Sequence, residues 1–238
     1  MFNLESYKKL MDECRDFNQN LYEKENPGEK IGFMYDGPVD PDNWNTKKPK
    51  VVFLCKEHYG WQGCDSRYIW KEDKDFNGLK FYKYLAAFTR LFEMYFSGQD
   101  ITGEDVKTKV YQSEEEIKAG WKNVAMIEVK KISGDGQESN GAEVREHARK
   151  NNEFLTKQLK MLDPDIIFCC GQVTFDVLTV DLKYFDLNLD ELDDSKKCYK
   201  FDNKYVINSC HPSKPGFNIV NVWGDIVNCL KSLPELPK

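Results

Sequence analysis

The run Val51-Val52-Phe53-Leu54-Cys55 gives the clearest indication of the fold of this chain. It is apolar at every position and lies between Pro49 and the polar residues that begin at Lys56. Such a run is typical of a strand that is buried on both faces, as in the middle of a parallel sheet. Two further runs, at residues 124–127 and 165–170, are also apolar apart from Asp165. The sequence therefore predicts a sheet of several parallel strands.

Stretches with helical spacing of apolar residues separate these runs, which predicts helices between successive strands. We expect an α/β fold of three layers, α/β/α, with a mostly parallel central sheet. One domain over residues 1–238 is the simplest account, with an N-terminal helical extension at about residues 1–48. Within it, residues 35–44 are rich in turn formers and are expected to form an ordered excursion. The expected helices cover residues 4–26, 79–96, 113–119, 142–162, 171–178 and 218–233, and residues 199–201 and 205–207 are expected to pair as a hairpin.

The composition is that of a folded protein with a sizeable core. Of the 238 residues, 40% are hydrophobic, and no apolar run approaches the roughly 20 residues that span a bilayer. The N-terminus lacks the pattern of a secretion signal, so a cytoplasmic protein without membrane contact is expected. The net charge of −6 gives no general support for nucleic-acid binding, although it leaves room for a local basic groove.

The chain contains eight cysteines and no C-x-x-C pair. Several of them lie in or beside the apolar runs, where cysteine behaves as a small hydrophobic residue. We therefore expect reduced thiols, no metal site and no cofactor. A monomer is the expected state.

Polar side chains follow the predicted strands at the point where each strand ends. Glu57, His58 and Tyr59 follow the first run, and Glu128 and Lys131 end the second. The last strand leads into a loop with two prolines and a glycine, which holds His211 and Ser213. Because ligands of open α/β sheets bind at the carboxyl ends of the strands, these residues form the predicted site.

The motifs at these strand ends resemble those of the uracil-DNA glycosylase superfamily. Cys55-Lys56-Glu57-His58-Tyr59 resembles the first motif of its uracil-specific members, Gly-Gln-Asp-Pro-Tyr, and residues 127–131 resemble the second. Residues 162–171 resemble the Leu-x-Pro-x-Ile-Ile-x-x-x-Gly run of the superfamily's iron–sulfur branch. Cys210-His211-Pro212-Ser213 resembles the third motif. The resemblance covers residues 50–233, with the motifs in order.

The resemblance implies a uracil-DNA glycosylase-like fold and a glycosylase that acts on DNA. It puts Glu57 at the water-activating position, Tyr59 at the position of the motif's tyrosine and Glu128 at the position of the base-reading asparagine. The chain departs from the pattern in Cys55 and His58, which replace the Gly and Pro of the first motif. The cluster cysteines of the iron–sulfur branch are absent, so no cluster is expected.

The chemistry of base removal supports two catalytic roles independently. Cleavage of an N-glycosidic bond builds positive charge on the sugar, which a carboxylate such as Glu57 stabilises while it orients water. The departing base becomes negative, and a donor such as His211 stabilises it as an oxyanion hole does. Glu57 as an acid at the start of a helix, and His58 as a residue of loop packing, are the structural alternatives. The remaining histidine, His147, is expected to be solvated.

The expected partner is DNA, duplex or single-stranded, with the target nucleotide flipped out of the stack. Ser213 and Lys214 are expected to hold phosphate on one strand end, and Lys131 and Ser133 on the other. Pro215 or Phe217 is the expected wedge that fills the gap left by the base.

Glu128 bears on the choice of base. A carboxylate offers acceptors and accepts from the amino group of cytosine, which favours cytosine or a 5-modified cytosine over uracil. Removal of modified bases from phage DNA, as an antiviral defence, is one biological use of such an enzyme. A shift of register would bring Asn123 or Lys131 to the base instead. Two other functions stay open: a catalytically silent nucleic-acid-binding member of the superfamily, and a nucleoside or nucleotide hydrolase.

Overall fold

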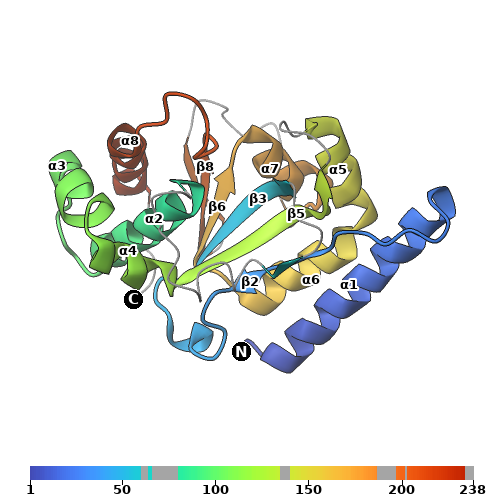
Figure 1. The fold of residues 1–238 in the computed structure, drawn as a ribbon. Coiled ribbons are helices and arrows are strands. Elements are labelled where there is room, and N and C mark those ends of the chain that lie inside the picture. The colour runs from blue at the N-terminus through green and yellow to red at the C-terminus, as the bar shows by residue number, and fades with distance from the viewer. Residues whose placement is uncertain (60–63, 66–79, 135–139, 187–196, 202, 234–238) are drawn as a thin grey trace.

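The computed structural model describes residues 1–59, 64–65, 80–134, 140–186, 197–201 and 203–233. A sheet lies in the middle of the molecule and helices cover both of its faces (Figure 1). This arrangement confirms the predicted three-layer α/β/α architecture with a mostly parallel sheet. The described part of the chain contains no helix long and apolar enough to cross a membrane.

Most helices begin and end close to the predicted bounds. The helices are α1 (Leu4–Glu25), α2 (Lys80–Phe96), α3 (Gly103–Asp105), α4 (Glu114–Trp121), α5 (Gly141–Lys150), α6 (Asn152–Leu162), α7 (Gln172–Asp176) and α8 (Ile219–Lys231), with a 3-10 turn η1 (Trp44–Thr46) and the π-helical turns η4 (Val106–Tyr111) and η5 (Val177–Asp181). The strands are β1 (Met34–Tyr35), β2 (Gly37–Pro38), β3 (Val51–Tyr59), β4 (Cys64–Asp65), β5 (Val124–Gly134), β6 (Ile166–Cys170), β7 (Cys198–Phe201) and β8 (Lys204–Ser209). Strands β3 and β5 continue beyond the predicted apolar runs 51–55 and 124–127.

The main sheet has the order β2-β5-β3-β6-β8-β7. The four central strands β5, β3, β6 and β8 are parallel, and the two edge strands β2 and β7 run antiparallel to their neighbours. The short strands β1 and β4 pair separately. Since the central strands are parallel, their carboxyl ends meet at one edge of the sheet. Most of the predicted site residues lie in the carboxyl-terminal parts of β3 and β5 or in the loop after β8.

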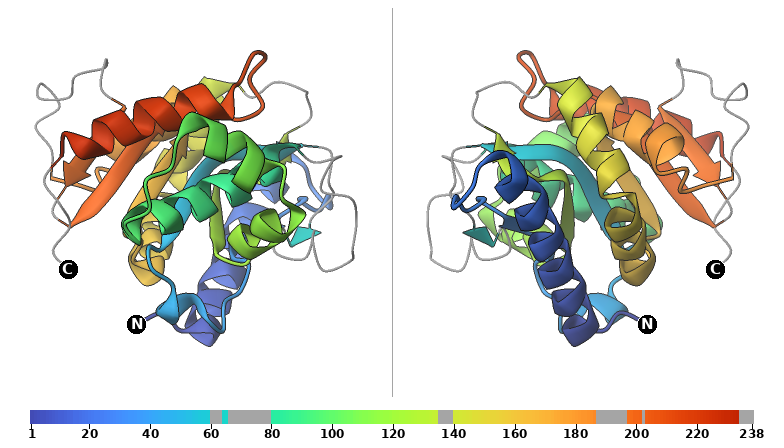
Figure 2. Two further views of the ribbon diagram at one scale, coloured as in Figure 1. Left: turned by 90° about the vertical axis from the view of Figure 1, so that its left-hand side faces the viewer. Right: turned by 90° about the vertical axis from the view of Figure 1, so that its right-hand side faces the viewer.

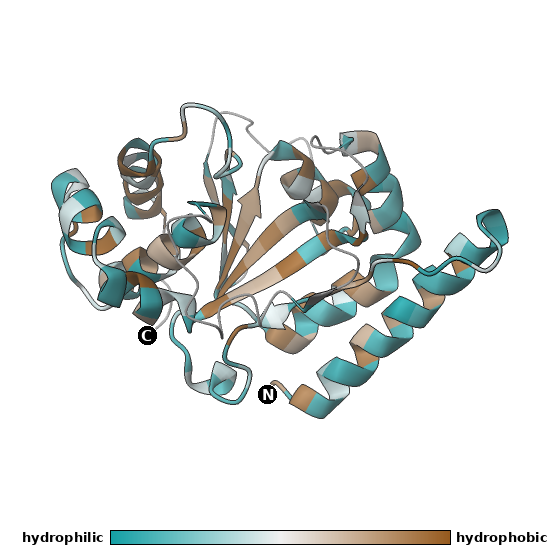
Figure 3. Cartoon of the chain, viewed as in Figure 1, coloured by the Kyte–Doolittle hydropathy of each residue, from teal (hydrophilic) through white to brown (hydrophobic). Residues whose placement is uncertain are grey.

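The apolar side chains of the central strands divide between two cores. On β3, Val51, Phe53 and Cys55 face the core that α2, α4 and α8 cover, whereas Val52 and Leu54 face the core on the other side. The strands are hydrophobic along most of their length (Figure 3) because both faces are buried. The same alternation determines on which face of the sheet the side chain of each site residue lies.

The N-terminal segment belongs to the second core. Helix α1 lies alongside α6 (Figure 2), and its Tyr7 and Met11 are buried against the face of the sheet that carries Val52 and Leu54. The predicted excursion at residues 35–44 contains β2, which pairs with β5 and extends the sheet by one strand. Residues 1–48 are therefore a structural part of the domain.

The helix predicted over residues 142–162 is two helices. Asn151 ends α5 with φ −105° and ψ 16°, and α6 begins at the next residue. The side-chain amide of Asn151 is used in buried hydrogen bonds to Asn18 of α1, 3.1 Å, and to the carbonyl of His147, 3.1 Å. Asparagine side chains compete with the helical ladder in this way, which the apolar spacing alone does not reveal. At the other end of α6, Asp163 adopts φ 43° and the helix stops before Pro164, as predicted.

Candidate active site

A row of polar and thiol side chains crosses the sheet near the carboxyl ends of the central strands. Cys55 of β3 is in register with Glu128 of β5, and Cys170 of β6 is in register with Ser209 of β8. The thiols of Cys55 and Cys170 interact, and the Glu128 carboxyl group is close enough to Cys55 to raise the pKa of its thiol when ionised. Cys55 and Cys170 belong to the core under α2, α4 and α8, so the row lies on that face of the sheet.

Glu57 lies one pleat further along the same face. It is in register with Lys130 of β5, and the Lys130 Nζ lies 2.8 Å from the Glu57 Oε2. The Glu57 side chain is only 2% exposed, and that of Lys130 is 17% exposed. Burial disfavours the Lys130 ammonium, but hydrogen bonds and charges from Glu57 and Glu143 outweigh it and raise the pKa of Lys130. The structure thus holds a buried carboxylate and ammonium together at the predicted edge.

His211 reaches the same side of the molecule from the loop that follows β8. Its ring stacks on Phe81 of α2, with ring centroids 5.2 Å apart and an angle of 10° between the planes. The backbone N–H of Ser213 donates to the His211 Nδ1 at 3.2 Å. Burial lowers the pKa of His211 to about 4, and the charge of Lys56 acts in the same direction. The ring is therefore neutral near pH 7, with its proton on Nε2 because Nδ1 is an acceptor.

Glu128 is a buried carboxyl group with acidic neighbours. The residue is 3% exposed, and its Oε2 has no hydrogen-bond partner among the described residues. Burial raises the pKa of Glu128 to about 8; the charges of Asp36 and Glu57 also raise it, whereas Lys131 opposes them. Near neutral pH this carboxyl group is mostly protonated.

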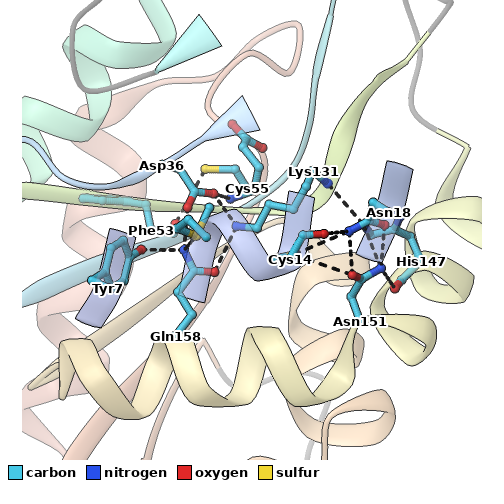
Figure 4. A network of polar contacts seen from close by, with 12 residues as sticks. Tyr7, Cys14, Asn18, Asp36, Phe53, Cys55, Lys131, His147, Asn151 and Gln158 are labelled. Atoms are coloured by element: carbon cyan, nitrogen blue, oxygen red, sulfur yellow. Dashed lines mark hydrogen bonds and ion pairs between the residues drawn. The ribbon is translucent and has the colours of Figure 1, made fainter. Parts of the chain in front are cut away.

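Asp36 lies near the start of the predicted excursion at residues 35–44. It binds β5 on the face of the sheet opposite Glu57. Its Oδ2 accepts the backbone N–H of Glu128 at 2.6 Å and pairs with the Nζ of Lys131, and its Oδ1 accepts from the Gln158 side chain (Figure 4). Gln158 Nε2 also donates to the Tyr7 hydroxyl, and its Oε1 accepts from Lys131 at 2.9 Å. The cluster therefore joins α1, β5, α6 and the residue between β1 and β2, on the face of the sheet opposite Glu128.

The polar network continues toward His147, which was predicted from the sequence to be solvated. That expectation was wrong. The His147 Nε2 accepts the backbone N–H of Lys131 at 3.3 Å. Burial lowers the pKa of His147 to about 3, and the charges of Lys131, Lys130 and Lys150 act in the same direction. Its place in α5 turns it toward the sheet, so it supports β5 and takes no part in the site.

Two residues considered as alternatives to Glu128 lie elsewhere. Asn123 precedes β5 and is therefore at the opposite edge of the sheet, where its side-chain amide donates to Glu93. Lys131 points to the other face of the sheet, and its side chain is 1% exposed against Asp36. Its ammonium is not available to a DNA phosphate, which corrects the expected role of Lys131. Of the three, only Glu128 lies on the face and edge of Glu57.

The loop after β8 divides into an exposed tip and a packed end. Ser213, Lys214 and Pro215 are exposed, and the Lys214 backbone N–H donates to the His211 carbonyl at 2.9 Å. Phe217 packs against Tyr84 with ring centroids 4.7 Å apart, and against Phe88. Phe217 is thus committed to the helix layer, which leaves Pro215 as the better placed of the two expected wedges.

The other predicted residues lie in the last residues of β3 and β5. Burial lowers the pKa of His58, so its ring is neutral near pH 7. The backbone of Tyr59 pairs with Gly134 beyond an irregularity in β3, and its side chain lies outside the described residues. Ser133 is half-buried, and its backbone N–H donates to the Gly32 carbonyl at 3.1 Å.

The described residues contain no group of three or more His, Cys, Asp or Glu side chains that could hold a metal ion. Among the cysteines that the structure describes, Cys14, Cys55, Cys169, Cys170, Cys198, Cys210 and Cys229 are free thiols. Burial raises the pKa of Cys55 and Cys169 well above the ordinary value. These thiols are core residues with little nucleophilic character.

The fold and site define the class of the protein: an α/β protein with a mostly parallel sheet, carrying a buried carboxylate and a neutral imidazole at its carboxyl edge. The sequence matches no family model and no curated protein. The superfamily resemblance therefore rests on the order of the motifs.

Proposed function

We propose that this protein is a DNA glycosylase, which hydrolyses the N-glycosidic bond of a flipped-out base and leaves an abasic site. One observation carries the proposal. A buried carboxylate, Glu57, and a neutral imidazole, His211, lie at the carboxyl edge of one sheet and on the side that α2 covers. Base removal requires a carboxylate on the sugar side and a donor on the base side.

Glu57 takes the part of the carboxylate. Its ion pair with Lys130 and its burial hold the side chain in place, so little reorganisation is needed during the reaction. In the transition state the sugar gains positive charge, which the carboxylate stabilises at short range. The same group orients the attacking water and accepts its proton.

His211 takes the part of the donor. The Ser213 N–H fixes Nδ1 as the acceptor, so Nε2–H is the donor of the neutral ring. A donor that is already in place stabilises the developing negative charge of the departing base without reorientation. Stacking on Phe81 restricts the ring further.

The exposed tip of the loop supplies contacts to the nucleic acid. Lys214 is exposed beside His211, and Ser213 offers a hydroxyl group at the same tip. Lys56 acts on His211 electrostatically and adds positive charge at this edge. Such cations position a phosphate backbone without reading sequence. Pro215 is the proposed wedge in the stack.

A panel of modified duplexes tests this function. The purified protein is incubated with duplexes and single strands that contain uracil, hypoxanthine, 5-methylcytosine, 5-hydroxymethylcytosine or glucosylated cytosine. We expect alkali-sensitive abasic sites and release of the free base with at least one of them. DNA binding without release of any base would favour the silent binding member, and release from free nucleosides alone would favour a nucleoside hydrolase. Either outcome would overturn the proposal.

A further inference from the structure

The charges nearest to Glu128 do not balance if every group is ionised. Three carboxyl groups, those of Asp36, Glu57 and Glu128, lie near two ammonium groups, those of Lys130 and Lys131. Lys130 pairs with Glu57 and Lys131 pairs with Asp36. Each ammonium is thus committed to another carboxylate, and Glu128 has no cation of its own.

The other neighbours of Glu128 supply no cation that could pair with its carboxyl group. Cys55, on the adjacent strand, has a raised pKa because of its burial and stays a neutral thiol. Asp36 receives the backbone N–H of Glu128, so its negative charge is directed at the strand that carries the carboxyl group. Burial of an unpaired carboxylate is unfavourable, and the usual outcome is that the group takes up a proton.

The position of Glu128 points to a ligand. Its side chain lies on the face and at the edge that carry Glu57, on the strand beside β3. Its Oε2 is buried and lacks a hydrogen-bond partner among the described residues, whereas the side chain of Asp36 has partners on both oxygens. Buried polar atoms are nearly always satisfied, so an unpartnered oxygen at such an edge indicates an atom that bonds to a ligand.

We infer that Glu128 is held as a neutral carboxylic acid that reads the base, donating one hydrogen bond to its Watson–Crick edge and accepting another from it. This inference rests on the proposed function and specifies its substrate class. A neutral carboxyl group has one O–H donor and a carbonyl acceptor. It fits a base edge that carries one donor and one acceptor side by side, in either order.

The substrate class is therefore wider than an ionised Glu128 would allow. Against a cytosine-type edge, the O–H donates to N3 and the carbonyl accepts from the amino group. Against a uracil-type edge, the O–H donates to O4 and the carbonyl accepts from N3–H. Glu128 then selects a paired donor and acceptor, and groups elsewhere in the site distinguish cytosine from uracil.

Two substitutions separate the neutral acid from the carboxylate. Glutamine carries a donor and an acceptor but no charge, and methionine has a similar length without either. We expect Glu128→Met to slow base release from the best duplex of the panel by about 10- to 100-fold, because the base edge loses two partners. Glu128→Gln should recover most of that loss. It should also abolish the fall in rate of the wild type above about pH 8, where Glu128 ionises.

If Glu128→Gln were as slow as Glu128→Met, an ionised carboxylate would be required and the inference would be overturned. The protonation state is also measured without any substrate. In the wild-type protein labelled with carbon-13 at the glutamate carboxyl groups, the resonance that is missing from Glu128→Gln should titrate well above the ordinary range of glutamate. Titration near pH 4.5 would overturn the inference while leaving the glycosylase proposal intact. An inactive panel with an elevated titration would overturn the glycosylase and the base-reading role together, and would leave only the neutral state of Glu128 standing.

Discussion

At the scale of single residues, the two ion pairs at the end of β5 have different environments. Lys130 and Glu57 meet on the site face, and Lys131 and Asp36 meet on the other, although Lys130 and Lys131 are adjacent in sequence. Successive side chains of a strand point to opposite faces, so neighbours serve different structures. One pair belongs to the proposed chemistry and the other holds the strand in place.

Removal of one partner of the buried pair Lys131–Asp36 tests whether this pair stabilises the fold. Lys131→Met leaves Asp36 as a buried charge without its ammonium, so we expect the free energy of unfolding to fall by about 3–5 kcal/mol. Urea denaturation followed by circular dichroism measures the change. Lys118→Met, which removes an ammonium from a half-exposed pair with Glu114 on α4, should change the stability much less. An equal loss of unfolding free energy in the two variants would contradict the stabilising role of the Asp36–Lys131 pair.

The positions of some site residues could be predicted from the sequence and those of others could not, for physical reasons. Glu57 and His211 follow apolar runs directly, so their edge of the sheet could be predicted. The face on which Lys131 lies could not, because a shift of one residue reverses every side chain of a strand. Asp36 was missed because it lies 92 residues before Glu128, in a stretch of turn formers with no sign of pairing.

At the scale of elements, β2 is the part of the sheet that the sequence did not predict. It consists of Gly37 and Pro38 alone, and two residues are too few to show an alternating pattern. A proline is tolerated here because β2 is an edge strand. The pairing places Asp36 beside β5, so this short strand connects the N-terminal segment to the site.

Gly37 allows α1 to approach this strand closely. Its φ is +123°, and a Cβ at this position would lie 2.7 Å from the ring of Tyr7. We expect Gly37→Ala to lower the free energy of unfolding by about 1–3 kcal/mol through backbone strain and the clash. Gly224→Ala, in the middle of α8 with open space around the new Cβ, should instead raise it by about 0.5–1 kcal/mol. Urea midpoints measure both, and a destabilised Gly224→Ala or an unaffected Gly37→Ala would contradict this packing.

At the scale of the whole molecule, the site depends on segments that are far apart in the sequence. Strands β3 and β5 supply Glu57 and Glu128, the loop after β8 supplies His211, and α2 supplies the ring on which His211 stacks. The alternation of strands and helices was enough to predict that these segments meet at one edge. The break between α5 and α6 and the burial of His147 were not predictable, because both follow from tertiary hydrogen bonds through Asn151 and the backbone of Lys131.

The proposed mechanism requires Glu57 to act on the sugar during base release. Glu143 offers a matched control, because the Lys130 ammonium contacts both the buried Glu57 at 2.8 Å and the exposed Glu143 at 3.4 Å. The most direct measurement is the single-turnover rate of base release from the best duplex of the panel, for Glu57→Gln and Glu143→Gln. We predict that Glu57→Gln is slower than the wild type by about 100-fold or more, and that Glu143→Gln stays close to it. A Glu57→Gln protein that releases the base at the wild-type rate would contradict the catalytic role of Glu57.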